Sequence, residues 1–235
     1  MEHTFDYLVV GAGMAGEAAA QALRDSDANA SIGMLGAESH PPYDRPPLTK
    51  KLWKDGKEAD IWRPIDKARA AVTLNRRAVK LDPAAHTVHD DKGDTWKYRK
   101  LLIATGGTPR KLAGGDDFIY YRTFDDYQRL RKVAKPGARI VVVGGGFIGS
   151  EIAAAMAMND CKVTMVFPED AIGARAYPES LADAVTAYYR EKNVDVRAGI
   201  TVKHGERSGG TIKLTLSDGT TLEADAVVAG LGITP

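Results

Sequence analysis

The stretch Ile140–Ile152, IVVVGGGFIGSEI, decides the fold class of this chain. Its four apolar residues 140–143 predict a buried strand, and the spacing Gly144-x-Gly146-x-x-Gly149 then leads directly into a predicted helix. Glycines at this spacing let backbone N–H groups approach a pyrophosphate, while the start of the helix supplies unpaired donors and a positive dipole. The stretch therefore predicts a dinucleotide-binding βαβ unit.

A second copy of the pattern occurs at Tyr7–Ala20, YLVVGAGMAGEAAA, with Gly11, Gly13 and Gly16 at the same spacing. One such pattern is a weak signal, and the alternative is a βαβ unit without a ligand. Three glycines at this spacing serve no packing purpose individually, which favours the nucleotide interpretation. Two dinucleotide sites in one chain are what an enzyme needs to pass electrons from one nucleotide cofactor to another.

Composition is that of an ordinary globular protein. The residues are 44% hydrophobic and 27% charged, with a formal net charge of +1. A length of 235 residues is sufficient for two small domains. The balanced charge gives no reason to expect nucleic acid or an anionic membrane as a partner. No apolar run is long enough to span a bilayer, and no leader precedes the first strand, so we expect a cytoplasmic protein.

Cysteine and histidine usage gives no sign of a metal or disulfide site. The single cysteine, Cys161, excludes a CxxC redox pair and a disulfide within the chain. It precedes an apolar run and is expected at the edge of the core. The five histidines are scattered, so no metal site is predicted.

Two nucleotide-binding domains are expected, residues 1–112 and residues 113–235. The first should contain strands at 7–10, 30–35 and 97–104, a helix at 14–23 and short strands between 71 and 104. The second should contain helices at 124–133 and 178–191 and strands at 140–143, 162–167, 194–197, 212–216, 221–223 and from 226.

Acidic residues follow the second strand of each unit. Glu38 lies 27 residues after Gly11, and Glu169 lies 25 residues after Gly144, where an acid can accept hydrogen bonds from an adenosine ribose. Glu169 favours NADH, because a carboxylate repels the extra phosphate of NADPH. Because the positively charged Arg175 lies nearby, NADPH is kept as the alternative coenzyme.

A proline-rich segment, His40–Trp53 or HPPYDRPPLTKKLW, crosses between the first elements. Its four prolines fix the backbone, and a helix is expected to begin near Thr49 as N-cap. The segment is either a stiff surface loop, a polyproline ligand for a partner, or a preorganised support that holds Arg45 and Lys50 beside a cofactor. Farther on, the glycine-rich exit 105–109 after a predicted strand is a usual place for backbone to touch a ligand.

These stretches resemble the FAD- and NAD(P)H-dependent pyridine nucleotide oxidoreductases, and most closely the branch of apoptosis-inducing factor and the ferredoxin and rubredoxin reductases. The motifs that carry the resemblance are PYDRPPLTKKLW (42–53), LLIATGGTPR (101–110), VVVGGGFIGSEIA (141–153) and VTMVFPED (163–170). The resemblance implies an α/β fold of two doubly wound Rossmann-like dinucleotide-binding domains, with the NAD domain inserted into the FAD domain.

The resemblance also assigns site residues. FAD would be held by the first motif, by the ribose-binding acid and by contacts along the cofactor: Gly11, Gly13, Met14, Ala15, Gly16, Glu38, Arg45, Lys50, Val79, Thr105, Gly106 and Arg122. NADH, and less readily NADPH, would be held by the second motif, by the adenosine-end residues and by one glycine near the nicotinamide: Gly144, Gly146, Phe147, Ile148, Gly149, Glu169, Arg175 and Gly232.

Three residues are expected to take part in the reaction. Phe147 would cover the flavin until nicotinamide displaces it, and Glu151 would pair with Lys50 beside the flavin ring. A lysine there could stabilise the negative charge of reduced flavin while the glutamate orients it. The alternative is that Lys50 and Glu151 are two separate surface charges.

The family pattern continues beyond Pro235 with a return to the FAD domain and a further C-terminal domain. We therefore expect this sequence to be a piece of a longer chain, with the FAD domain incomplete and the NAD domain complete. The expected function is transfer of hydride from NADH to FAD and of electrons to a separate acceptor, such as ferredoxin, rubredoxin or a quinone. The alternative is a nucleotide-binding, redox-sensing module without turnover. The sequence does not determine the oligomeric state.

Overall fold

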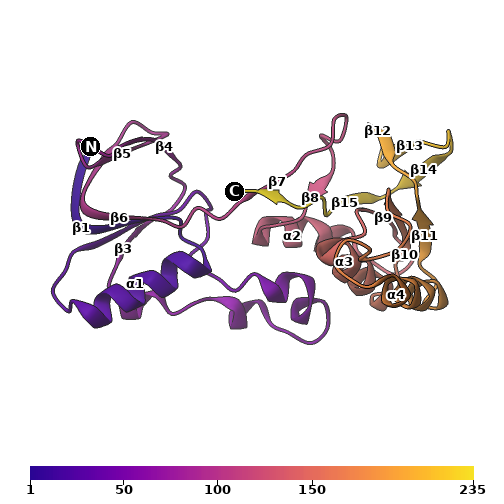
Figure 1. Cartoon of the computed structure of the whole chain (residues 1–235), viewed down its shortest axis with the longest axis horizontal. Helices are drawn as coiled ribbons and strands as arrows, with labels where there is room; N and C mark the ends of the chain where they lie inside the picture. The colour runs from indigo at the N-terminus through magenta and orange to yellow at the C-terminus, as the bar shows by residue number, and fades with distance from the viewer. The chain divides into compact units, whose positions relative to one another are not determined.

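The computed structural model describes all 235 residues and forms two compact units (Figure 1). Unit 1 comprises Met1–Asp44, Lys57–Gly107 and Pro235, and unit 2 comprises Arg45–Gly56 and Thr108–Thr234. The compact units thus divide the chain at Gly107, and the Arg45–Gly56 segment belongs to unit 2. The domain limits 1–112 and 113–235 stay a prediction.

Unit 1 is built on a six-stranded sheet in the order β3-β2-β1-β6-β5-β4. Its strands are β1 (Glu2–Val10), β2 (Ile32–Leu35), β3 (Ala71–Thr73), β4 (Ala78–Asp82), β5 (Thr87–Asp90) and β6 (Thr95–Ile103). The first four strands in that order are parallel, whereas β5 and β4 are antiparallel to their neighbours. The 3-2-1 order of the parallel part is that of a doubly wound nucleotide-binding domain.

Both faces of β1 are buried at its C-terminal end, residues 8–10, where side chains alternate between the two sides of the sheet. Val9 packs with residues of helix α1 (Met14–Ser26), while Leu8 and Val10 pack with Val88 and Trp96 on the other face. The 3₁₀ turns η3 (Glu58–Ile61) and η4 (Ile65–Ala68) connect to β3. A continuous apolar strand covered on both sides is typical of a parallel sheet.

Unit 2 contains an all-parallel, five-stranded sheet in the order β11-β10-β9-β15-β8. The strands are β8 (Ile119–Tyr120), β9 (Arg139–Val143), β10 (Lys162–Phe167), β11 (Asp195–Ala198) and β15 (Ala226–Ala229). The helices are α2 (Phe124–Val133), α3 (Phe147–Met158) and α4 (Glu179–Glu191). The doubly wound α/β class predicted from the sequence is confirmed.

A smaller antiparallel sheet covers the second face of the parallel sheet in unit 2. It consists of β12 (Val202–Ser208), β13 (Thr211–Leu216) and β14 (Thr221–Ala224), and one apolar cluster joins it to β9, β10 and β15. The two-residue strands β7 (Thr108–Pro109) and β16 (Ile233–Thr234) pair separately. No helix in the structure combines the length and apolar character that crossing a membrane requires.

The proline-rich segment differs from its prediction. It forms two 3₁₀ turns, η1 (Pro46–Thr49) and η2 (Lys51–Trp53), instead of a helix beginning at Thr49. Pro46 and Pro47 occupy the first positions of η1, where a missing N–H costs nothing. The expectation that Thr49 caps a helix is therefore wrong, because Thr49 ends the first turn.

Candidate functional site

The first glycine motif forms a tight cradle between β1 and α1. Gly11 has φ +124°, and a Cβ there would lie 2.1 Å from the carbonyl oxygen of Ala104. A Cβ at Gly16 would lie 1.9 Å from the carbonyl oxygen of Gly11, so only glycine lets the helix approach the strand this closely. The expectation that these glycines serve no packing purpose individually is therefore wrong for Gly16. Gly13 is the N-cap of α1, and no side chain caps the helix, which leaves its first N–H groups for a ligand.

The second motif repeats this geometry between β9 and α3. Gly144 has φ +113°, and a Cβ at Gly149 would lie 1.9 Å from the carbonyl oxygen of Gly144. Gly146 is the N-cap of α3, again without a side-chain cap, and a Cβ there would meet open space. Both cradles therefore have the shape that a nucleotide pyrophosphate requires, and the residues present fit such a group.

Each predicted ribose-binding acid lies just past the second strand of its βαβ motif. Glu38 follows β2, is partly buried and accepts a hydrogen bond from the Tyr43 hydroxyl at 2.5 Å. Glu169 follows β10 and forms an ion pair with Arg175. The Arg175 side chain is 79% exposed and that of Glu169 is 21% exposed, so the arginine can leave the carboxylate without disturbing the core.

Several other predicted FAD contacts lie at or near the same edge of the unit 1 sheet. Thr105 and Gly106 are exposed and follow directly after Ala104, whose N–H donates to the carbonyl of Val10. Asn75 and Arg76 donate backbone hydrogen bonds to Glu38 and Gly36, which brings the segment leading to Val79 to this edge.

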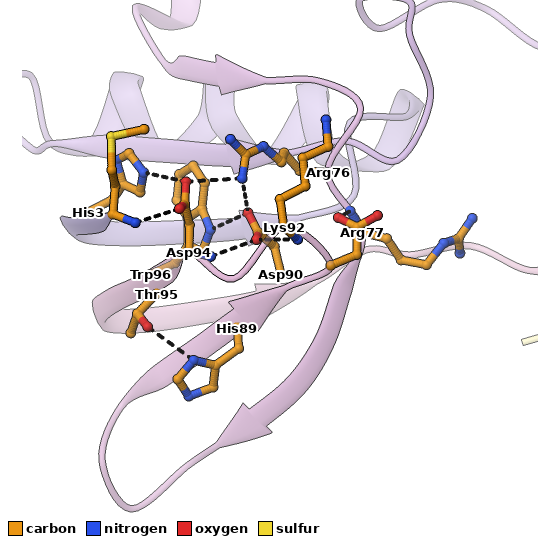
Figure 2. Close-up of polar contacts among 11 residues, drawn as sticks. His3, Arg76, Arg77, His89, Asp90, Lys92, Asp94, Thr95 and Trp96 are labelled. Carbon is orange, nitrogen blue, oxygen red and sulfur yellow. Dashed lines mark hydrogen bonds and ion pairs between the residues drawn. The ribbon is translucent and has the colours of Figure 1, made fainter.

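Val79 is 61% exposed and lies where the register between β4 and β5 shifts by one residue. The segment before it is fixed by Arg76, which reaches Asp90 Oδ2 at 2.9 Å and Asp94 Oδ2 at 3.0 Å (Figure 2). Trp96 donates its indole N–H to the same oxygen of Asp90. This polar cluster ties the strand that contains Val79 to the β5–β6 hairpin.

Unit 2 brings Lys50 and Glu151 together. Lys50 Nζ lies 2.7 Å from Glu151 Oε2, in the second turn of α3, so the two residues are not separate surface charges in this structure. Thr49, which the sequence analysis did not include in the site, donates its hydroxyl to the same oxygen at 2.5 Å. Arg45 Nη1 donates to the carbonyl oxygen of Arg122 at 2.9 Å, so two predicted FAD contacts also meet.

Phe147 is the first residue of α3 and is 58% exposed. Its ring packs edge-on against Tyr177, with centroids 6.0 Å apart. Tyr177 was also missed, because nothing in its local sequence distinguishes it from a core aromatic residue. Gly232 accepts a hydrogen bond from the N–H of Arg110 and has φ +82°. Nowhere in the 235 described residues do three His, Cys, Asp or Glu side chains gather as metal ligands.

The chain is similar in sequence to a known protein family and to several of its characterised members. A family model described as pyridine nucleotide-disulphide oxidoreductase matches residues 5–235. The chain is 35% identical over 239 residues to the ferredoxin–NAD(+) reductase component of the p-cumate 2,3-dioxygenase system of Pseudomonas putida, covering 97% of this chain and 58% of the relative. It is 33% identical to monodehydroascorbate reductase of Solanum lycopersicum, covering 100% of this chain and 60% of the relative.

A solved structure, the covalent putidaredoxin reductase–putidaredoxin complex, superposes with a TM-score of 0.91 at 28% identity. The match covers 99% of this chain and 59% of that reductase chain. The chain thus spans less than two thirds of the length of the relatives that it matches.

Proposed function

The chain belongs to the pyridine nucleotide-disulphide oxidoreductase family, and from this membership we propose that it acts in an FAD-dependent NADH oxidoreductase. The observation that carries the proposal is the repeated cradle, in which Gly11 and Gly16 have the same close contacts as Gly144 and Gly149. Two such cradles suit two dinucleotides, as hydride transfer between cofactors requires. The resemblance found in the sequence is confirmed by the family match.

The residues of each cradle have distinct roles in this proposal. The first cradle and Glu38 would hold FAD through backbone N–H groups and a carboxylate at the ribose, and Arg45 and Arg122, which meet within unit 2, are proposed as further FAD contacts. When bound, FAD supplies a ring that accepts hydride from NADH and releases electrons to an acceptor. The second cradle holds NADH, and Glu169 accepts hydrogen bonds from the ribose and repels a 2′-phosphate.

Lys50 supplies a fixed positive charge in the proposed reaction. An ammonium group close to developing negative charge stabilises it, and Glu151 holds that ammonium through the 2.7 Å ion pair. In the proposal, Phe147, which is exposed at the start of α3, shields the ring until nicotinamide displaces it. A small redox carrier protein is the proposed acceptor, since several relatives are named as ferredoxin–NAD(+) reductase components. A quinone acceptor and a cytoplasmic location remain part of the proposal.

Anaerobic stopped-flow mixing of NADH with the FAD-reconstituted chain tests the proposal. We expect the flavin absorbance to bleach in a single turnover, and a ferredoxin added afterwards to restore it. A flavin-loaded chain that binds NADH without any bleaching would instead be a nucleotide-binding module without turnover.

A further inference from the structure

The segment Arg45–Gly56 is fixed within unit 2 through one carbonyl group. The carbonyl oxygen of Leu48 accepts the indole N–H of Trp53 at 2.7 Å and the hydroxyl of Tyr121 at 2.5 Å. All three residues are buried, and burial raises the pKa of the Tyr121 hydroxyl, which therefore stays protonated as a donor. The peptide that joins Leu48 to Thr49 is consequently held in one orientation.

The same segment is also tied to α3. Asn159, which follows the last residue of that helix, donates its side-chain N–H to the carbonyl oxygen of Trp53 at 3.0 Å. The Trp53 ring packs edge-on against Tyr127 of α2, with centroids 5.3 Å apart. Because Glu151 lies on α3, the backbone of Thr49 and the carboxylate of Glu151 share one rigid support.

Thr49 forms a triangle with the ion pair. Its hydroxyl donates to Glu151 Oε2 at 2.5 Å, Lys50 Nζ reaches the same oxygen at 2.7 Å, and Nζ lies 3.4 Å from the Thr49 hydroxyl oxygen. The carbonyl of Pro46, at 3.4 Å, is a much longer alternative acceptor for the hydroxyl. Thr49 is 6% exposed, whereas the Lys50 side chain is 55% exposed, so the threonine is the fixed member of the three.

We propose that Thr49 is a positioning residue, whose hydroxyl fixes the Glu151 carboxylate and thereby holds the Lys50 ammonium in one place. An exposed lysine–glutamate pair alone gains little over its solvated forms, because ordering two flexible side chains offsets the attraction. A short hydrogen bond to a carboxylate is stronger than one between neutral groups and selects one rotamer of Glu151. The consequence for electron transfer rests on the proposed function, but the positioning itself does not.

The first test needs no flavin. Thr49→Val has nearly the same shape but removes the hydroxyl, which is the donor to Glu151 and also a weak 3.4 Å acceptor for Lys50 Nζ, while Thr49→Ser keeps it. The ¹⁵N signal of the Lys50 ammonium, assigned by its loss in Lys50→Arg, reports solvent exchange of that group. We expect exchange to be about tenfold faster in Thr49→Val and near the parent rate in Thr49→Ser, as for loss of one charge-assisted hydrogen bond. Unchanged exchange in a folded Thr49→Val variant would overturn the proposal.

The second test measures the effect of Thr49 on reduction of the flavin by NADH. With FAD bound, we expect Thr49→Val to slow reduction by NADH about tenfold without weakening NADH binding, and Thr49→Ser to restore the rate. In a Glu151→Ala background, which has no acceptor for the Thr49 hydroxyl, the valine substitution should have no further effect on the rate or on exchange, and an additive effect would contradict positioning through Glu151. If exchange changes as expected while Lys50→Ala is reduced at the parent rate, positioning stands and the role of Lys50 in the proposed function fails.

Discussion

The ammonium of Lys50 and the carboxylate of Glu151 meet at 2.7 Å although 101 residues separate them in the chain. Both belong to unit 2, because the proline-rich segment leaves unit 1 after Asp44 and returns at Lys57. The ion pair therefore lies within one compact unit.

Replacing Lys50 by alanine should slow hydride transfer from NADH to FAD. Removing one preorganised charge from the reacting centre costs about a hundredfold in rate in enzymes of other families, and a similar loss is expected here. Single-turnover stopped-flow measures the rate. The matched control is Lys54→Ala, since Lys54 is an exposed lysine of the same segment that forms no ion pair in the structure. Equal rates for both variants would reject the role of Lys50.

Gly146→Ala should separate binding from folding. The N-cap backbone of Gly146, with φ −80°, suits alanine, and the added methyl group meets no protein atom within 4 Å. Stability should fall by less than about 1 kcal/mol, while the methyl group would intrude on the proposed pyrophosphate site. We expect at least a roughly tenfold loss of NADH affinity, measured by fluorescence titration.

Two further glycines serve as controls for that variant. A Cβ at Gly149 would lie 1.9 Å from a backbone oxygen, so Gly149→Ala should destabilise unit 2 itself, as thermal unfolding would show. Gly210→Ala, at an open position in the β12–β13 turn, should change neither property. Normal NADH binding by Gly146→Ala would contradict a nucleotide site at this cradle.

The sequence predicted the cradles better than the contacts between distant segments, and the reason is physical. The glycine spacing encodes local constraints, positive φ at Gly144 and close packing at Gly149, which do not depend on the rest of the fold. The bond from Thr49 to Glu151 joins residues 102 positions apart, so no local pattern reveals it. Strand β12 was missed because only Val202 and Gly205 of its seven residues are buried, which leaves no apolar alternation.

Glu169→Ala should shift coenzyme preference toward NADPH. In the proposed site, the substitution removes a carboxylate that would repel the 2′-phosphate, and it releases Arg175, which would then be free to bind that phosphate. We expect the ratio of the NADPH and NADH dissociation constants to fall by about tenfold or more, as one charge-assisted contact would give. Asp170→Ala, the exposed neighbour, should leave the ratio unchanged. A preference that Glu169→Ala does not alter would place the adenosine ribose elsewhere.

The polar cluster in Figure 2 should make unit 1 sensitive to acid. Burial of Asp90 opposes its ionisation, but hydrogen bonds from the N–H groups of Asp94, Trp96 and Lys92 and the charge of Arg76 outweigh this and lower its pKa. The pKa of Asp94 is also lowered, first by its bond to the N-terminal amine. These carboxyls thus take up protons at a higher pH in the unfolded chain than in the folded one.

Stability from these groups is therefore complete above an unfolded pKa of about 4 and is lost as pH falls through the lower folded values. We expect the thermal midpoint of unit 1 to drop steeply between about pH 5 and pH 3. Asp90→Asn should be less stable at neutral pH, and its thermal midpoint should fall less steeply between about pH 5 and pH 3, because the side chain at position 90 cannot titrate. Asp91→Asn, which alters an exposed neighbour that accepts one backbone hydrogen bond from Arg77, should keep the steep profile. If the thermal midpoints of the parent protein and Asp90→Asn fell equally steeply with falling pH, other carboxyls would govern the acid transition.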